Sequence, residues 1–399
     1  MRLFILFWLL GSLSALFGVE TAPTLDSKYH DSSKCKACHG HIVKPWSHSY
    51  HARSHYKKDE YFRKTIDYVA KKTFQPVNAI KVYCAACHNP RISVTSTDMS
   101  YEIKVLMGED KNSAVNKAVN DSAISEGINC LVCHNINKIK EHLPPSKRGV
   151  HRIRWNPVGT MSGPFKDADS PYHKTQYREF FDTNSKQLCF VCHANERSIY
   201  NVEFTNTQKE YVKTDKQCIE CHMGPKKEGF ASSLPIDHGK PRKRMVREHS
   251  FMGGHFKQLW KGALGLKAKR EGKDLSVTIL NPNPHNIPTG FGARELIVEV
   301  TYRDASQKVL ATKSVSITPH YRDRDGKATL PHLATKIIDN PSIPAQGEKT
   351  LTFPLVKGSK QITIEIYYRL VNDEVRGLLH LKEAQWSEKK FVNRTTLEL

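Results

Sequence analysis

Residues 35–55 read CKACHGHIVKPWSHSYHARSH, with two cysteines and five histidines in 21 positions. The first five residues form a Cys-x-x-Cys-His box. The same box recurs at residues 84–88, 130–134, 189–193 and 218–222, and together the five boxes use all ten cysteines of the chain. No cysteine remains for a disulfide, the usual role of cysteine in an exported protein.

Each box has the chemistry that attaches a c-type haem. Two cysteines separated by two residues on a helical turn place both sulfurs along one porphyrin edge, and the adjacent histidine lies under the iron. A zinc site or a redox-active disulfide would also use Cys-x-x-Cys. Zinc would require boxes paired at regular spacing, whereas the first cysteines here are 49, 46, 59 and 29 residues apart. The sequence therefore predicts five covalently bound haems.

The cysteines of the five boxes are the predicted attachment points: Cys35, Cys38, Cys84, Cys87, Cys130, Cys133, Cys189, Cys192, Cys218 and Cys221. The predicted proximal iron ligands are His39, His88, His134, His193 and His222.

The composition agrees with a haem-filled interior. The 399 residues are 39% hydrophobic with a mean hydropathy of -0.53, which excludes a polytopic membrane protein. Five porphyrins would supply apolar mass that the side chains lack, so the haem region, residues 23–258, should be mainly helical with little regular sheet. Without haem we expect this region not to fold, because little else is present to bury.

The N-terminus predicts export. Arg2 precedes an apolar run from Leu3 to about Val19, with small residues toward its end, which is typical of a signal peptide over residues 1–22. An uncleaved anchor is the alternative, since 17 apolar residues are at the short limit for spanning a bilayer. Haem attachment follows export, so we expect a periplasmic protein.

Several stretches resemble a known family of multihaem cytochromes, which includes the tetrahaem cytochrome c of ammonia oxidisers and, more distantly, hydroxylamine oxidoreductase. The resemblance covers roughly residues 33–300. In the first box region it rests on Trp46, Ser49, His51 and Ala52. Further along it rests on YCAACHNP, EGINCLVCHN, SGPFKDADSPYHKTQYREFFDTNSKQLCFVCH, CIECHMGP and REHSFMGGH.

The resemblance implies which of the fifteen remaining histidines bind iron from the distal side. It ranks them in the order His51, His173 and His249, then His255 and His285. For each, the alternative is a surface histidine or a hydrogen bond to a haem propionate. His41 and His48 are expected to contact solvent or a propionate, and His55, among Arg53, Lys57 and Lys58, is expected to be exposed.

The C-terminal third, residues 259–399, contains no cysteine and changes to alternating apolar and polar residues. DLSVTIL, ELIVEVTYR, VLATKSVSIT, KTLTFPLV and QITIEIYYRL each show this period of two, between turn-rich stretches. Ile362, Ile364 and Ile366 should share one face of a strand. These features predict an all-β sandwich of immunoglobulin-like size.

The loop NPNPHNIPTGFG, residues 281–292, is rigid enough to hold an imidazole at the tip of this sandwich, and so to bring His285 to a haem. A similar His-x-x-Pro-Thr-Gly loop occurs beside haem domains of the family it resembles. An ordinary loop histidine is the alternative.

The net charge of +21 suggests an acidic redox partner. The basic runs KPRKRMVRE and RGVHRIRWN are interpreted as contacts to propionates or to such a partner, and not as nucleic-acid sites. A solvated basic surface is the alternative. Membrane contact is expected only through the signal segment or a quinol-oxidising partner.

An electron carrier is the first hypothesis for function: a periplasmic pentahaem cytochrome between a quinol-linked or soluble donor and a terminal reductase. The alternative is an oxidoreductase that acts on a small nitrogen or sulfur compound at a five-coordinate haem. No box reads Cys-x-x-Cys-Lys, so the lysine-ligated catalytic haem of pentahaem nitrite reductases has no counterpart here. Nor are there eight boxes, as in hydroxylamine oxidoreductase, whose tyrosine crosslink to haem is not assigned to any of the 15 tyrosines. A third possibility is a subunit whose haems connect a larger complex.

Overall fold

The computed structural model describes residues 31–144, 147–214, 216–235, 239–339 and 341–399. Over these residues it forms two compact units, each of which is described by itself. The predicted export signal lies outside the described residues. Within them, no helix combines the length and the apolar character needed to cross a bilayer.

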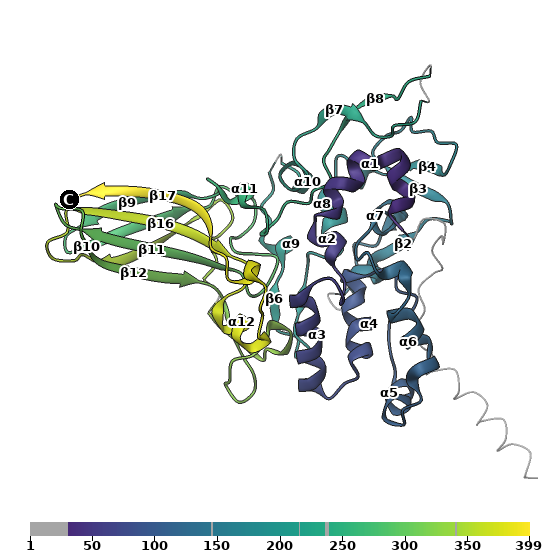
Figure 1. The fold of residues 1–399 in the computed structure, drawn as a ribbon, viewed down its shortest axis with the longest axis horizontal. Coiled ribbons are helices and arrows are strands. Elements are labelled where there is room, and N and C mark those ends of the chain that lie inside the picture. The colour runs from purple at the N-terminus through teal and green to yellow at the C-terminus, as the bar shows by residue number, and fades with distance from the viewer. Residues whose placement is uncertain (1–30, 145–146, 215, 236–238, 340) are drawn as a thin grey trace, which may run out of the picture. The chain divides into compact units, whose positions relative to one another are not determined.

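Unit 1 comprises the described residues up to Leu143, together with Lys147–Asp182 and Glu228–His249, and it contains the first three boxes (Figure 1). Its helices are α1 (Ser33–Ser47), α2 (Tyr50–Arg53), α3 (Glu60–Thr73), α4 (Val77–His88), α5 (Met99–Leu106), α6 (Ala114–Val119) and α7 (Cys130–His134). Its strands form three two-stranded sheets: β1 (Ile136–Ile139) with β2 (Ile153–Trp155), β3 (Thr160–Gly163) with β4 (Lys174–Tyr177), and β7 (Lys227–Phe230) with β8 (Lys243–Val246).

Side-chain caps fix where the helices of unit 1 begin. The carboxylate of Asp59 accepts a hydrogen bond from the backbone of α3 at 2.7 Å, and Asp98 caps α5 in the same way at 2.9 Å. Asn129 caps α7, so that the third box starts on a helical turn at Cys130. The short helices are therefore specified locally, as the predicted mainly helical haem region requires.

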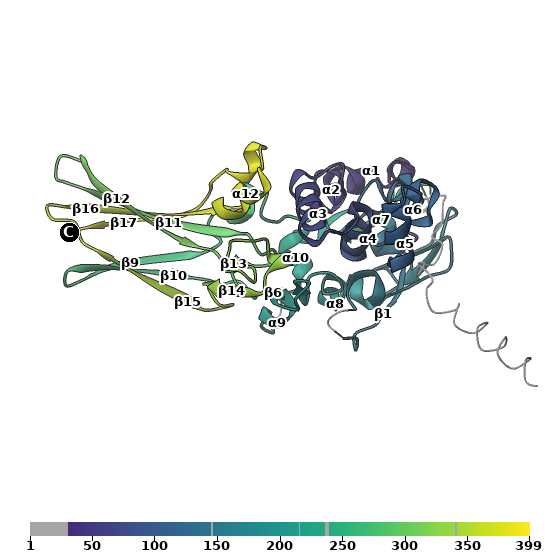
Figure 2. The same cartoon turned by 90° about the horizontal axis from the view of Figure 1, so that it is seen from below.

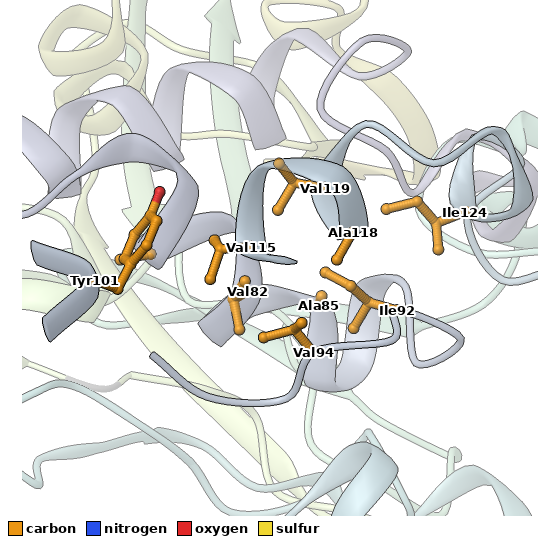
Figure 3. Close-up of a cluster of buried hydrophobic side chains, with 10 residues drawn as sticks. Val82, Ala85, Ile92, Val94, Tyr101, Val115, Ala118, Val119 and Ile124 are labelled. Carbon is orange, nitrogen blue, oxygen red and sulfur yellow. The ribbon is translucent and has the colours of Figure 1, made fainter. Parts of the chain in front are cut away.

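A cluster of aliphatic side chains packs α4, α5 and α6 together (Figure 3). Val82, Ile92 and Val115 are each no more than 1% exposed, and Tyr101 closes one side of the cluster. The expectation that little besides haem is buried in this region was wrong for these helices. That expectation was based on the amino-acid composition of the whole chain. An average over the chain does not show that the apolar residues of α4–α6 are concentrated in one cluster.

Unit 2 comprises Thr183–Lys227 and Ser250–Leu399, and it contains the fourth and fifth boxes. Its helices are α8 (Ser185–Cys189), α9 (Thr207–Glu210), α10 (Cys218–His222), α11 (Lys257–Trp260) and α12 (Asp373–Leu379). Its long strands are β9 (Gly265–Glu271), β10 (Asp274–Leu280), β11 (Glu295–Arg303), β12 (Val309–Ile317), β15 (Glu348–Pro354), β16 (Gln361–Arg369) and β17 (Lys390–Glu398). Short strands pair as β5 (Glu196–Arg197) with β6 (Glu203–Thr205) and β13 (His320–Arg322) with β14 (Lys336–Asp339).

The long strands form two sheets, in the orders β15-β10-β9 and β12-β11-β16-β17, with antiparallel neighbours throughout. Figure 2 shows these sheets as separate layers. The predicted inward face of β16 is confirmed, since Ile362, Ile364 and Ile366 are fully buried. Leu275 and Val277 on β10 are also fully buried, so each sheet contributes one apolar face to a common interior.

Candidate haem-binding sites

The first box places His39 opposite His173 in unit 1. His39 lies at a kink in α1, where its φ and ψ of -118° and 30° depart from helical values. The two ring centres are 6.5 Å apart, with an angle of 32° between the ring planes. Nδ1 of His39 is hydrogen-bonded to the carbonyl oxygen of Ala231 at 2.6 Å, and Nδ1 of His173 lies 3.4 Å from the carbonyl oxygen of Lys174.

The third box places His134 opposite His249, also in unit 1. Their ring centres are 6.3 Å apart and their planes differ by 26°. Nδ1 of His134 is hydrogen-bonded to the carbonyl oxygen of Ser162 at 2.7 Å, and Nδ1 of His249 to that of Arg247 at 3.1 Å. Burial lowers the pKa of His249 to about 4, with a further contribution from His134, so both rings are neutral near pH 7.

The fifth box places His222 opposite His285 in unit 2. The ring centres are again 6.3 Å apart with planes 26° from parallel. Nδ1 of His222 is hydrogen-bonded to the carbonyl oxygen of Met252 at 2.5 Å, and Nδ1 of His285 to that of Asn286 at 2.9 Å. Burial also lowers the pKa of His285, which keeps this imidazole neutral.

Hydrogen bonds fix the loop that carries His285. The side-chain amide of Asn281, which is 1% exposed, donates to the carbonyl oxygen of His285 at 2.9 Å and to that of Pro344 at 2.9 Å. The carbonyl oxygen of Pro284 accepts from the backbone N–H of Val212 at 2.9 Å. The loop at the end of the sandwich is thus attached to the segment between the fourth and fifth boxes.

The three ring separations are those of two imidazoles on one metal ion. Each imidazole nitrogen binds a metal at about 2 Å, and the ring centre lies about 1.1 Å behind that nitrogen, so a coaxial pair has centres about 6.2 Å apart. The 6.3–6.5 Å gaps therefore have room for an iron between each pair of histidines.

These hydrogen bonds also determine which nitrogen of each imidazole ring has a lone pair available to a metal. In all six rings Nδ1 is next to a backbone carbonyl oxygen, which can accept a hydrogen bond but cannot donate one. Nδ1 must therefore carry the proton, which leaves the lone pair on Nε2. Metal-binding histidines have this arrangement, in which the outer partner sets the tautomer and the ring orientation. The chemistry of these donors fits haem iron.

The second box is held by different contacts in unit 1. Nδ1 of His88 is 2.9 Å from the hydroxyl of Ser54, and the ring of Phe62 stacks on the imidazole with centres 4.3 Å apart. Gly149 has a φ of 60°, and a Cβ there would clash with the backbone of Ala86 inside the box. The chain therefore approaches this box closely, as the glycine permits.

The fourth box lies in unit 2. Burial lowers the pKa of His193 to about 4, with further contributions from His222 and Arg294, yet its side chain remains open to solvent. Iron ligation by His193 stays a prediction.

The histidines of residues 35–55 differ in their environments. His51 lies on α2, which begins where the hydroxyl of Ser49 accepts the N–H of Ala52 at 3.3 Å. His41 and His48 are exposed, as expected. The prediction that His55 is exposed was wrong: it is 7% exposed, and burial beside three lysines lowers its pKa to about 4. The turn between α2 and α3 buries it, whereas the prediction used only its charged neighbours in sequence.

His51 and His255 lie outside the three facing pairs. A Cβ on Gly127 would meet the carbonyl oxygen of His51 at 2.6 Å, so the segment before the third box packs directly on α2. The ring of His255 lies 4.4 Å from that of Phe256. For these two histidines, iron ligation stays a prediction.

Boxes that are distant in sequence lie together within each unit. A hydrogen bond from the thiol of Cys35 to Cys130 raises the pKa of Cys35 and lowers that of Cys130 to about 7, so the first and third boxes are neighbours. A hydrogen bond from Cys189 lowers the pKa of Cys218 in the same way, so the fourth and fifth boxes are neighbours. Sequence spacing gave no sign of either pairing.

A search of solved structures finds a similar fold. A penta-heme cytochrome c552 from Thermochromatium tepidum superposes with a TM-score of 0.68 at 19% identity, and the match covers 95% of this chain and 100% of that one. The chain has the fold of a multihaem cytochrome c. No family model matches the sequence, and no curated protein matches it. The specific resemblance to cytochromes of ammonia oxidisers therefore stays a prediction, while the multihaem cytochrome fold is confirmed.

Proposed function

We propose that the protein is an exported pentahaem c-type cytochrome that carries electrons between a quinol-linked or soluble donor and a terminal reductase. The observation that carries this proposal is the set of three facing histidine pairs, 39/173, 134/249 and 222/285, each with ring centres 6.3–6.5 Å apart. Bound haem supplies reversible one-electron chemistry, and two imidazoles on one iron leave no position for a substrate.

The protein's own contribution is to fix the ligands. The carbonyl oxygens that hold Nδ1 keep each imidazole oriented, so that little rearrangement accompanies a change of iron charge. For the second and fourth boxes, His51 and His255 remain the proposed distal ligands. An enzyme acting on a small nitrogen or sulfur compound is the alternative, and it requires one haem without a distal ligand.

The C-terminal sheets support the immunoglobulin-like assignment. In the described part of the chain, the sandwich has seven long strands. In chain order, the first, second and fifth of them (β9, β10 and β15) form one sheet, and the other four (β11, β12, β16 and β17) form the second. This division of seven antiparallel strands is of the immunoglobulin kind. We propose that the sandwich contributes a distal ligand through the His285 loop.

We further propose that an acidic redox protein docks where the β7–β8 hairpin meets the first box. The N–H of Ser233 donates to the carbonyl oxygen of Cys38 at 2.8 Å, and Ala231 holds the ring of His39. Arg242 and Arg244 pair with Asp167 at 3.2 and 2.8 Å, which joins the hairpin to the segment before His173.

This docking face combines apolar and basic groups around one haem site. Tyr172, Phe230 and Met245 are 59%, 38% and 53% exposed, and Lys36 and Lys240 are exposed nearby in the same unit. Exposed lysines attract a partner of the opposite charge, and this attraction accelerates encounter. The partner we propose is therefore a small acidic electron-transfer protein.

Charge reversal should test the docking face. Replacing Lys36 and Lys240 by glutamate should lower the second-order rate of electron transfer to an acidic redox protein about tenfold at low salt. Stopped-flow absorbance in the haem Soret band would measure this rate. The difference should disappear as salt screens the charges.

The matched control replaces Lys357 and Lys360, two exposed lysines of the sandwich, by glutamate. This variant has the same change of net charge and should lose much less of the rate. Equal losses in both variants would show that total charge, and not this face, determines the rate. No loss in either would argue against an acidic partner.

A further inference from the structure

Two cationic residues lie at one end of the sandwich in unit 2, where Lys390 is buried and Arg294 is half-buried. Lys390, the first residue of β17, is 2% exposed. It is directly opposite Tyr368 of β16, which is fully buried. Because opposed residues of antiparallel strands share a face, the lysine and the tyrosine lie side by side in the interior.

Arg294 reaches the same place from the end of the His285 loop. Its Nη1 donates a hydrogen bond to the hydroxyl of Tyr368, and the ring of Trp260 stacks on Tyr368 with centres 3.7 Å apart. Nε of Arg294 is buried and has no hydrogen-bond partner among the described residues. A Cβ at Gly254 would collide with Nη1 of Arg294 and the hydroxyl of Tyr368. The glycine therefore leaves space that this arginine fills.

The charges in this cluster do not balance. Nζ of Lys390 lies 3.2 Å from one oxygen of Glu388, and Nζ of Lys257 lies 2.6 Å from the other. Glu295, the buried first residue of β11, is already paired with Arg369. Glu388 thus contacts two cations, Lys257 and Lys390, and no carboxylate among the described residues forms an ion pair with Arg294. Buried charge that lacks a counter-ion is costly, so the arrangement calls for an anion.

The cluster is close to the proposed haem ligands. A Cβ at Gly254, the residue before the proposed ligand His255, would meet Nη1 of Arg294 at 2.2 Å. Arg294 also follows closely on the loop of residues 281–292, in which the side-chain amide of Asn281 holds the carbonyl oxygen of His285. Haem carries two carboxylates on its propionate groups, and these are the anions that the proposed function brings to this end of unit 2.

We propose that Arg294 and Lys390 bind a propionate of the haem that His222 and His285 ligate. The inference rests on the proposed function and extends it. Arginine offers planar N–H donors that match a carboxylate, and the buried ammonium of Lys390 adds a second charge. By neutralising the propionate these residues favour the ferrous state, whose net charge is lower by one, and so hold this haem at a higher reduction potential than an unpaired propionate would.

Arg294→Gln tests this inference in the full-length, haem-loaded protein. One of the five redox transitions, followed by optical titration, should move to lower potential while the other four stay unchanged. Resonance Raman should show an altered propionate bending band. Arg294→Lys should recover part of the shift, because it restores the charge without the planar donors. Lys390→Met should move the same transition, and it serves as the second variant if Arg294→Gln matures poorly.

The matched control is Arg303→Gln on β11, whose guanidinium donates to the carbonyl oxygen of Gln307 at the surface. It should leave all five transitions unchanged. A free anion is the other possible occupant of the cluster. If nitrite or sulfate shifts one transition of the wild-type protein saturably and Arg294→Gln abolishes that shift, the propionate assignment is overturned.

Failure of this inference is distinguishable from failure of the proposed function. A fully loaded protein in which both variants leave every transition unchanged would overturn only the propionate site. A protein without haem at Cys218 and Cys221 would overturn the function on which the site depends.

Discussion

Polypeptide made without haem should keep its sandwich folded and lose the tertiary structure of unit 1. The sandwich has an apolar interior of its own, in which Leu296, Val298 and Ile364 are fully buried. In unit 1 the rings of the first and third boxes instead face gaps with room for iron. Without haem these gaps lose their apolar filling, and an unfilled interior is strongly destabilising.

Limited proteolysis would measure this difference. The haem-free chain should be cut throughout unit 1 and in the box-bearing segment Thr183–Lys227 of unit 2. It should leave a resistant fragment that begins near α11, because Trp260 packs on Tyr368 and Gly262 donates to Val392 at 2.8 Å. The cluster on α4–α6 should preserve some helical circular dichroism but not protection. Uniform resistance of both units would show that haem is not needed for the fold, and loss of both would show that the sandwich is not independently stable.

His285→Ala should convert one of the five haems from low spin to high spin. The variant removes the imidazole that faces His222 across 6.3 Å and leaves the iron with one axial ligand. Electron paramagnetic resonance should show a new high-spin ferric signal, and the reduced variant should bind one carbon monoxide per chain. Loss of the distal ligand changes that haem completely and leaves the other four unchanged. The high-spin signal and the bound carbon monoxide should therefore each amount to about one haem per chain.

His320→Ala is the matched control, since His320 is a partly exposed histidine on β13 of the same unit. It should give no high-spin signal. If His285→Ala also gives none, His285 is an ordinary loop residue and the sandwich does not complete a haem site. If the intact protein already binds carbon monoxide stoichiometrically, the enzyme alternative replaces the carrier, and nitrite, hydroxylamine and tetrathionate become the compounds to assay.

The sequence predicted local features more successfully than features created by tertiary packing. A Cys-x-x-Cys-His box is defined within one helical turn, and the strands of the sandwich are defined by a period of two, so both are visible in the sequence. The predicted inward face of β16 agrees with the burial of Ile362, Ile364 and Ile366 for this reason.

Relations between distant segments were less predictable. The adjacency of Cys35 with Cys130 depends on how α1 and α7 pack, and no spacing encodes it. The predicted exposure of His55 was wrong because lysines next to it in sequence do not determine whether the turn that carries it is buried. His173, His249 and His285 were chosen through a family resemblance, and the structure places each of them opposite a proximal histidine.

The haem content of the mature protein is the most direct test of the account, because every proposal above depends on it. Intact mass spectrometry under denaturing conditions would measure it, since covalent haem remains attached when the chain unfolds. The account predicts five haem additions to one chain and no free thiols, one addition for each pair of cysteines. Four or fewer additions in protein matured by a competent host, or cysteines paired in disulfides, would contradict it.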